Sequence, residues 1–134
     1  MNILLDTHLA IWVLFDDINL SAKAKKIILN PENNIYYSVV SSWEVLLKHA
    51  GNPHNMLTDV HQFVDACRRS GFLSLKLSDR HIITVETLSL NENAPDHKDP
   101  FDKLLIAQAK TENFLFLTHD KNLTFYNEAC VILV

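Results

Sequence analysis

The residues in this sequence best suited to chemistry are acidic side chains beside the predicted strands and helices. Asp6 directly follows the apolar residues 3–5, and Asp120 comes shortly after the apolar residues 114–117. Other acids begin helical stretches, and the full set is Asp6, Glu44, Asp99, Asp102 and Asp120. Like charges held close together raise one another's pKa and destabilise a fold unless a cation lies among them. Oxygen ligands of this kind favour Mg²⁺ or Mn²⁺.

Helix capping is the alternative explanation for several of these acids. Ser41 and Glu44 have the spacing of a capping box, and Asp99 with Asp102 nearly forms another. Acidic residues in a first helical turn also interact favourably with the helix dipole. Asp6 has no such role in this interpretation, because it directly follows an apolar strand, although a local turn bonded by its side chain stays possible. Asp120 also follows an apolar strand, so it too has no helix-capping role in this interpretation, and a local turn stays possible there as well.

Histidine ligands would indicate zinc instead. His8, His97 and His119 lie near the acidic residues, but no pair of histidines has the spacing of the usual zinc sites. We therefore interpret the three as polar surface or as contacts to phosphate. Trp12 and Trp43 recur among apolar neighbours, which predicts core packing rather than base stacking.

Alternating strands and helices can bring the five acids together. Strands are predicted at residues 3–5, 35–40, 72–77, 114–117 and 130–134. Helical segments are predicted at residues 9–15, 21–30, 41–51, 58–70 and 78–88, from residue 99 onward, and as a short turn at 121–126. In the third of these, Val45 and Leu46 are expected to face inward. The pattern predicts one α/β domain over residues 1–134, with a mostly parallel sheet flanked by helices on both faces. In such a sheet the acids share the edge where ligands bind.

Composition limits the kinds of partner. The 134 residues carry a formal net charge of −4, which argues against a broad basic surface for nucleic acid. Phosphate would need local help from short clusters such as Lys48 with His49. The longest apolar run, residues 9–15, is far too short to span a membrane, and no secretion signal is visible, so a cytoplasmic protein is expected. Cys67 and Cys130 are expected to be reduced and without function.

Four strings of residues occur in the order and spacing of one family. They are Leu4-Leu5-Asp6-Thr7-His8, Ser42-Trp43-Glu44, Asp99-Pro100-Phe101-Asp102-Lys103-Leu104-Leu105-Ile106-Ala107-Gln108-Ala109, and Leu117-Thr118-His119-Asp120. Together they resemble a PIN-domain nuclease, and more narrowly the VapC-type toxins of bacterial toxin–antitoxin pairs. The resemblance runs from Asn2 to Val134.

The resemblance implies a metal-dependent endoribonuclease that leaves a 5′-phosphate. Its acids carry over to Asp6, Glu44, Asp102 and Asp120, with Asp99 as an accessory metal ligand. Asp6, Asp102 and Asp120 would hold Mg²⁺ or Mn²⁺, and Glu44 would hold a water at the metal or act as the base. An RNA substrate, a homodimer and a cognate antitoxin protein are the expected partners, with no membrane. The family often has Asn or Ser where this chain has His119.

Two threonine hydroxyls are candidates for supporting the acidic site, and two other functions are weighed against a nuclease. Thr7 or Thr118 would orient a carboxylate through its hydroxyl. A haloacid-type phosphatase would need an acid two residues after Asp6, where this chain has His8. The alternative that stays open is a catalytically inactive PIN fold that serves only as a protein-interaction module.

Overall fold

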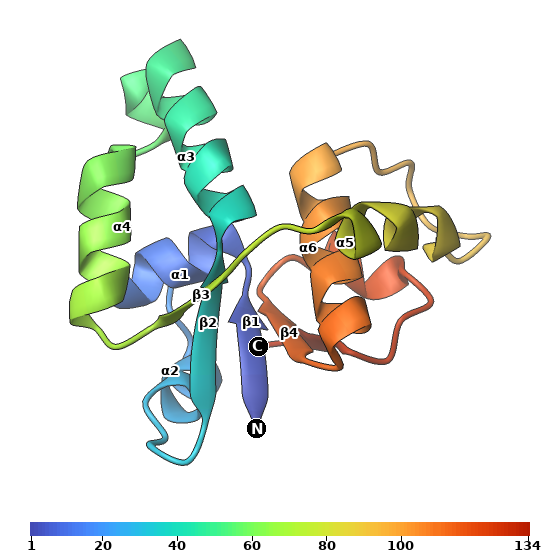
Figure 1. Cartoon of the computed structure of the whole chain (residues 1–134), viewed down its shortest axis with the longest axis horizontal. Helices are drawn as coiled ribbons and strands as arrows, with labels where there is room; N and C mark the ends of the chain where they lie inside the picture. Colours follow the sequence, from blue (N-terminus) through green and yellow to red (C-terminus); the bar gives the residue numbers. More distant parts are fainter.

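Five strands, all parallel, form the central sheet of the computed structural model, which describes residues 1–134 (Figure 1). The strands are β1 (Asn2–Leu5), β2 (Asn34–Ser38), β3 (Leu73–Leu75), β4 (Leu115–Thr118) and β5 (Val131–Leu133). Their order across the sheet is β3-β2-β1-β4-β5. All five predicted strands are present, each within a few residues of its predicted bounds, and the α/β class is confirmed.

Six α-helices and three short 3₁₀ turns connect the strands. They are α1 (Thr7–Leu14), α2 (Ala22–Ile28), α3 (Val39–Gly51), η1 (Pro53–Asn55), α4 (Val60–Arg69), α5 (Asp79–Thr84), η2 (Val85–Thr87), α6 (Pro100–Glu112) and η3 (Lys121–Phe125). Ser21 and Asp99 cap α2 and α6 through their side chains, as predicted. None of these helices combines the length and apolar character needed to cross a membrane.

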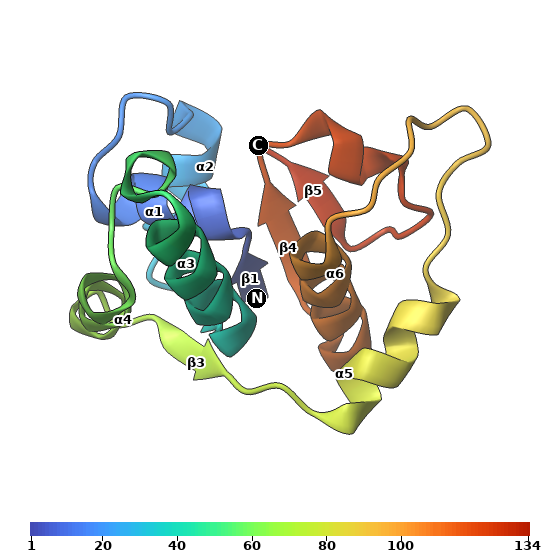
Figure 2. The ribbon, with the colours of Figure 1, turned by 90° about the horizontal axis from the view of Figure 1, so that it is seen from above.

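Both faces of the sheet are covered, because successive residues of β1 point to opposite sides. Ile3 and Leu5 belong to a core that β1 shares with α1, α2 and α4. Leu4 belongs to a second core shared with α6. All three side chains are fully buried, and each contributes about 1.5–3 kcal/mol through burial. Figure 2 shows α6 beside β4, with α1 and α2 on the other side of β1.

The order of the strands reverses between β1 and β4. Strands added along the chain lie on one side of β1 up to β3 and on its other side from β4 onward. The Asp6 amide donates to the Leu117 carbonyl at 2.9 Å, so the ends of β1 and β4 are held in register. Ligands in open α/β sheets bind outside the carboxyl ends of the strands at such a reversal. The fold therefore places its candidate site where Asp6 and the segment after β4 meet.

The start of α3 differs from the prediction. The helix begins at Val39, and the Ser38 side chain caps it by accepting from the Val40 amide at 3.0 Å. Glu44 consequently lies in the second turn, and the predicted capping box of Ser41 with Glu44 is wrong. The helix projects from the sheet (Figure 1), and the apolar side chains along its outer face are exposed.

Two side chains of α3 therefore have a different environment from the one predicted. Trp43 is 54% exposed and Leu46 is 42% exposed, so the predictions of core packing for Trp43 and of an inward-facing Leu46 are wrong. Val45, on the opposite face of the helix, is fully buried as expected. Trp12 is partly buried and packs against the core on the α1 side of the sheet.

Candidate active site

A hollow of about 260 Å³ lies at the carboxyl ends of β1 and β4. No hydrophobic residue lines it, and its walls are Asp6, His8, Glu44, Lys48, Asp99, Asp102, His119 and Asp120. All five acids singled out from the sequence meet here, although they come from four separate segments of the chain. The hollow is therefore a strongly acidic site.

Asp6 directly follows β1 and is 5% exposed. It occupies the position before α1 but makes no capping hydrogen bond with its side chain. Instead, the Thr118 hydroxyl donates to Oδ2 of Asp6 at 2.7 Å. Burial, opposed by this hydrogen bond and supported by the charge of Glu44, raises the pKa of Asp6 above its ordinary value. The absence of a local capping role agrees with the sequence-based expectation.

Glu44 is 2% exposed and is held by two neighbours. The Thr7 hydroxyl donates to Oε1 at 2.6 Å, and the Lys48 ammonium lies 2.5 Å from Oε2. Since the one proton of Thr7 goes to Glu44, the hydroxyl of Ser41, 2.8 Å away, donates to Thr7. Both threonines named from the sequence, Thr7 and Thr118, orient carboxylates of the site.

Lys48 is the one lysine that lines the hollow. Burial disfavours its charged form, but the hydrogen bond and charge of Glu44, with the charges of Asp99 and Asp102, raise the pKa of Lys48. The sequence analysis grouped Lys48 with His49 as a source of phosphate contacts. The spacing of four residues between Glu44 and Lys48 on one helix would have indicated this ion pair.

Asp99 and Asp102 begin α6. Oδ1 of Asp99 accepts from the Phe101 and Asp102 amides at 2.8 and 3.2 Å, so its capping role is real. Asp102 is mostly buried, and burial together with the charges of the other four acids raises its pKa to about 8. An acid with such a pKa in a polar hollow marks a place where negative charge lacks compensation.

Asp120 also has a local role. Its Oδ1 accepts from the Asn122 amide at 2.9 Å at the start of η3. This is the side-chain turn that the sequence analysis left open, and it leaves Oδ2 without a hydrogen bond. Asp120 therefore both begins η3 and faces the acidic hollow.

The three histidines near the acids differ in their surroundings. His8 lines the hollow. The His119 ring lies 4.0 Å from the Trp12 ring, and its Nδ1 is buried without a hydrogen bond. His97 does not line the hollow but contacts Asp102 with Nε2 at 3.2 Å. Sequence reasoning missed this last contact.

The donor set fits a hard divalent cation. Every carboxylate in the hollow offers oxygen. Burial and the charges of neighbouring carboxylates raise the pKa of Asp6 and Asp102, so a bound cation would favour their ionised forms. As the side chains stand, no three acidic, histidine or cysteine residues lie close enough together to ligate one ion. A cation would therefore have to draw the carboxylates inward, and at Glu44 it would compete with Lys48.

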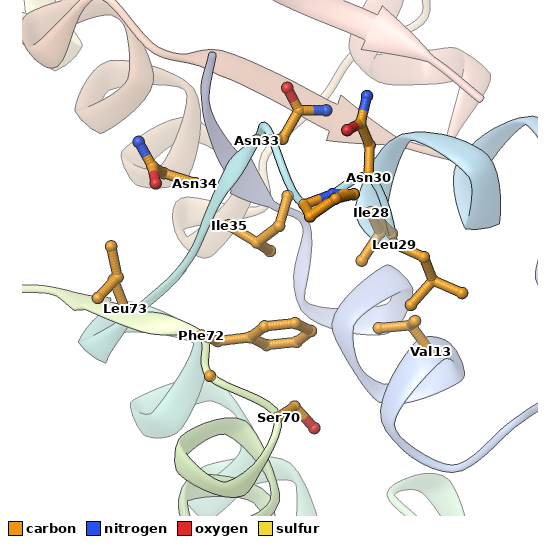
Figure 3. Close-up of a pocket in the computed structure, with 12 residues that line it drawn as sticks. Val13, Ile28, Leu29, Asn30, Asn33, Asn34, Ile35, Ser70, Phe72 and Leu73 are labelled. Atoms are coloured by element: carbon orange, nitrogen blue, oxygen red, sulfur yellow. The ribbon is translucent and has the colours of Figure 1, made fainter.

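A second hollow, of about 440 Å³, lies near the opposite end of β2. Figure 3 shows Val13, Ile35 and Phe72 among its lining residues, together with the amides of Asn30 and Asn33. No titratable side chain lines this hollow. It offers no carboxylate, histidine or cysteine that could bind a metal or act as a base, so the acidic hollow is the better candidate for a functional site.

Comparison with known proteins agrees with this arrangement. The family model described as the PIN domain matches residues 3–128. A search of curated proteins found no significant match. Among solved structures, the chain is similar to one in the crystal structure of VapBC2 from Rickettsia felis bound to a DNA fragment from their promoter. The TM-score is 0.66 at 15% identity, over 100% of this chain and 98% of that one, which shows a shared fold. The family match covers nearly the whole sequence and confirms what the motifs indicated: this chain belongs to the PIN domain family.

Proposed function

We propose that this chain is a metal-dependent endoribonuclease and the toxin of a toxin–antitoxin pair. The observation that carries the proposal is the convergence of five carboxylates on one polar hollow at the strand-order reversal. Membership in the PIN domain family supports a nuclease, and the similarity in fold to a chain of a VapBC2 complex supports the toxin assignment.

Asp6, Asp102 and Asp120 would hold Mg²⁺ or Mn²⁺, with Asp99 as an accessory ligand. Bound there, the cation would screen the charge of the scissile phosphate and make water a stronger nucleophile at neutral pH. The hydroxyl of Thr118 keeps the Asp6 carboxylate in place. The hard oxygen donors suit either ion.

Glu44 is the proposed base. Thr7 fixes one oxygen of its carboxylate, and Lys48 holds the other until substrate arrives. Glu44 takes a proton from the attacking water as the water oxygen bonds to phosphorus and the bond from phosphorus to the 3′ oxygen breaks. The departing 3′ oxygen takes up a proton from solvent water. The products are a 5′-phosphate and a 3′-hydroxyl. Lys48, released from Glu44, is then free to contact the phosphate.

Protein partners are also proposed. Val39, Trp43, Leu46 and Leu47 recur at spacings of three or four along the outer face of α3 and stay exposed. An apolar stripe of this kind suits burial against another protein surface. A second copy of the chain would cover it in a homodimer, and a cognate antitoxin would close the acidic hollow.

A cleavage assay tests this function. Single-stranded or loop RNA should be cut in the presence of Mg²⁺ or Mn²⁺, and cleavage should stop when EDTA removes the ion. Full activity in excess EDTA would contradict the metal mechanism. The competing possibility, an inactive PIN fold that only binds a partner, predicts no cleavage under any condition. Calorimetry with Mn²⁺ separates it further, because such a module need not bind the ion.

A further inference from the structure

Asp102 is linked to two residues from distant parts of the chain. Nε2 of His97 lies 3.2 Å from Oδ2 of Asp102, and Nδ1 of His97 lies 2.8 Å from the Tyr126 hydroxyl. The His97 and Tyr126 rings meet edge to face, with their centroids 5.5 Å apart. Tyr126 is buried, and the other two side chains are mostly so. The arrangement is a hydrogen-bonded chain that ends on one carboxylate of the acidic hollow.

The donors and acceptors of these three side chains determine which way the two hydrogen bonds run. A neutral imidazole has one N–H donor and one acceptor nitrogen. In the form that binds a cation, the Asp102 carboxylate is ionised and can only accept. In that form Nε2 of His97 must carry the proton and Nδ1 must accept one. Tyr126 supplies the matching donor, since burial and the charges of Asp102 and Asp99 raise its pKa to about 12 and keep its hydroxyl protonated. Tyr126 thus selects the tautomer of His97 that donates to Asp102.

Backbone hydrogen bonds bring together the two segments that carry His97 and Tyr126. Leu90 forms an isolated bridge with Tyr126, the Asn91 amide donates to the Phe125 carbonyl, and the Asn127 amide donates to the Ser89 carbonyl. The start of the segment that carries His97 is therefore pinned to the end of η3. The His97 ring reaches Asp102 from outside the hollow, because His97 is not among the residues that line it.

The geometry leaves one oxygen of Asp102 unoccupied. Oδ2 is held by His97, whereas Oδ1 makes no hydrogen bond, and Asp102 lines the hollow. Four other acids surround this carboxylate, and their repulsion favours its turning away or taking up a proton. The N–H of His97, which donates to Oδ2, opposes both the rotation and the protonation of this carboxylate. In metal sites, outer partners that fix a ligand's orientation commonly have this role.

We propose that His97 is a positioning residue that holds the Asp102 carboxylate in the orientation needed to bind a divalent cation, with Tyr126 fixing the tautomer of His97. The inference rests on the proposed function, because it concerns the same metal site. It assigns His97 to the support of a ligand rather than to contact with substrate or metal.

Three variants of the full chain test the proposal by calorimetry with Mn²⁺ alone. His97→Phe keeps a ring against Tyr126 but removes both hydrogen bonds, and it should weaken Mn²⁺ binding by about 10–100-fold. His97→Gln offers one donor and one acceptor and should keep most of the affinity. Tyr126→Phe removes the hydroxyl that selects the His97 tautomer but leaves the His97 ring in place. It should weaken Mn²⁺ binding less than His97→Phe. His61→Phe, at an exposed position on α4, is the matched control and should bind as the wild type does.

Thermal melts without metal and the electron paramagnetic resonance spectrum of bound Mn²⁺ accompany the calorimetry. A folded His97→Phe variant with wild-type affinity and spectrum would overturn the proposal. So would equal losses in His97→Gln and His97→Phe with lowered melting temperatures, which would give His97 a purely structural role. A wild type that binds no Mn²⁺ would overturn it as well. A wild type that binds Mn²⁺ but cuts no RNA contradicts only the proposed function, and the calorimetric comparison still decides the role of His97.

Discussion

The ammonium of Lys48 lies 2.5 Å from Oε2 of Glu44, within a hollow otherwise walled by acids and two histidines. Glu44 is buried, whereas 37% of the Lys48 side chain is exposed. The lysine therefore reaches in from the rim and supplies a positive charge to the metal-free site. Its position makes it a competitor of any cation that enters the hollow.

Replacing Lys48 should lower the stability of the metal-free protein but increase the stabilisation that a bound metal gives. Lys48→Met leaves the Glu44 charge buried and unpaired, so the metal-free chain should lose about 1–2 kcal/mol, a value between those of exposed and buried ion pairs. Added Mn²⁺ should then raise the melting temperature of the variant more than that of the wild type, because no lysine competes. Thermal melts with and without Mn²⁺ measure both effects.

Arg69→Met provides the matched control, because Arg69 pairs with Asp65 at the same spacing on α4 but both side chains are exposed. It should change neither melt noticeably. If Lys48→Met behaves like this control, the ion pair does not stabilise the acidic hollow.

The raised pKa of Asp102 predicts a dependence of stability on pH. The pKa of Asp102 is about 8 in the folded chain against an ordinary value of 3.8, so the folded state binds more protons between these limits. The metal-free chain should consequently lose stability as pH rises from about 4 to 8, with a slope from this group of at most about 1.4 kcal/mol per pH unit. Asp102→Asn should remove that part of the slope.

Urea unfolding at several pH values measures this slope in the wild type and in Asp102→Asn. All other ionisable groups are common to both proteins, so the difference between the two curves isolates the carboxyl group of Asp102. Parallel curves would show that Asp102 is ionised normally in the folded chain and that the hollow is less crowded with charge than the structure indicates.

Much of this site was predictable because each acid lies next to a local sequence feature. Asp6 follows an apolar strand, and Asp99 precedes a proline that suits the first turn of a helix. Parallel topology then brings such positions to one edge regardless of detailed packing. Local patterns and topology were sufficient to predict the strands, the presence of each helix and the convergence of the acids.

Other features depend on contacts that no local pattern encodes. Ser38 and Ser41 are both acceptable caps, and Val39 with Val40 favours a strand, so the sequence did not fix the start of α3. The Ser38 hydroxyl also contacts the Gln108 side chain of α6 at 2.5 Å, which ties the helix start to a residue 70 positions away. The contact of His97 with Asp102 likewise depends on the path of a long loop.

The exposed stripe of α3 predicts a homodimer. If a second copy covers Trp43, the wild type should be dimeric at micromolar concentration, and Trp43→Glu should be monomeric because a charge would be buried at the interface. Light scattering reports the mass of each protein. Ile18→Glu, at an exposed apolar residue outside α3, is the control and should stay dimeric. A wild type that is only monomeric argues against the dimer.

The sharpest test of the metal site uses Asp6, whose side chain makes no capping hydrogen bond. Asp6→Asn keeps the shape of the side chain, and its amide oxygen can still accept from Thr118. Because burial and the charge of Glu44 disfavour the ionised form of Asp6, removing its charge should raise the melting temperature of the metal-free chain. Added Mn²⁺ should stabilise the wild type, since it binds only the folded site, and should do much less for the variant.

RNA cleavage by the Asp6→Asn variant should fall by more than the roughly 10–100-fold that loss of an outer partner of a metal ligand produces. A purely local role for Asp6 makes the opposite prediction: asparagine would replace it with little change in melting, and both proteins would respond to Mn²⁺ alike. Melts and cleavage measured on the same preparations decide between the two. An active variant with an unchanged metal response would exclude Asp6 as a ligand and, because Asp6 is the most buried of the proposed ligands, would require a different site for the metal.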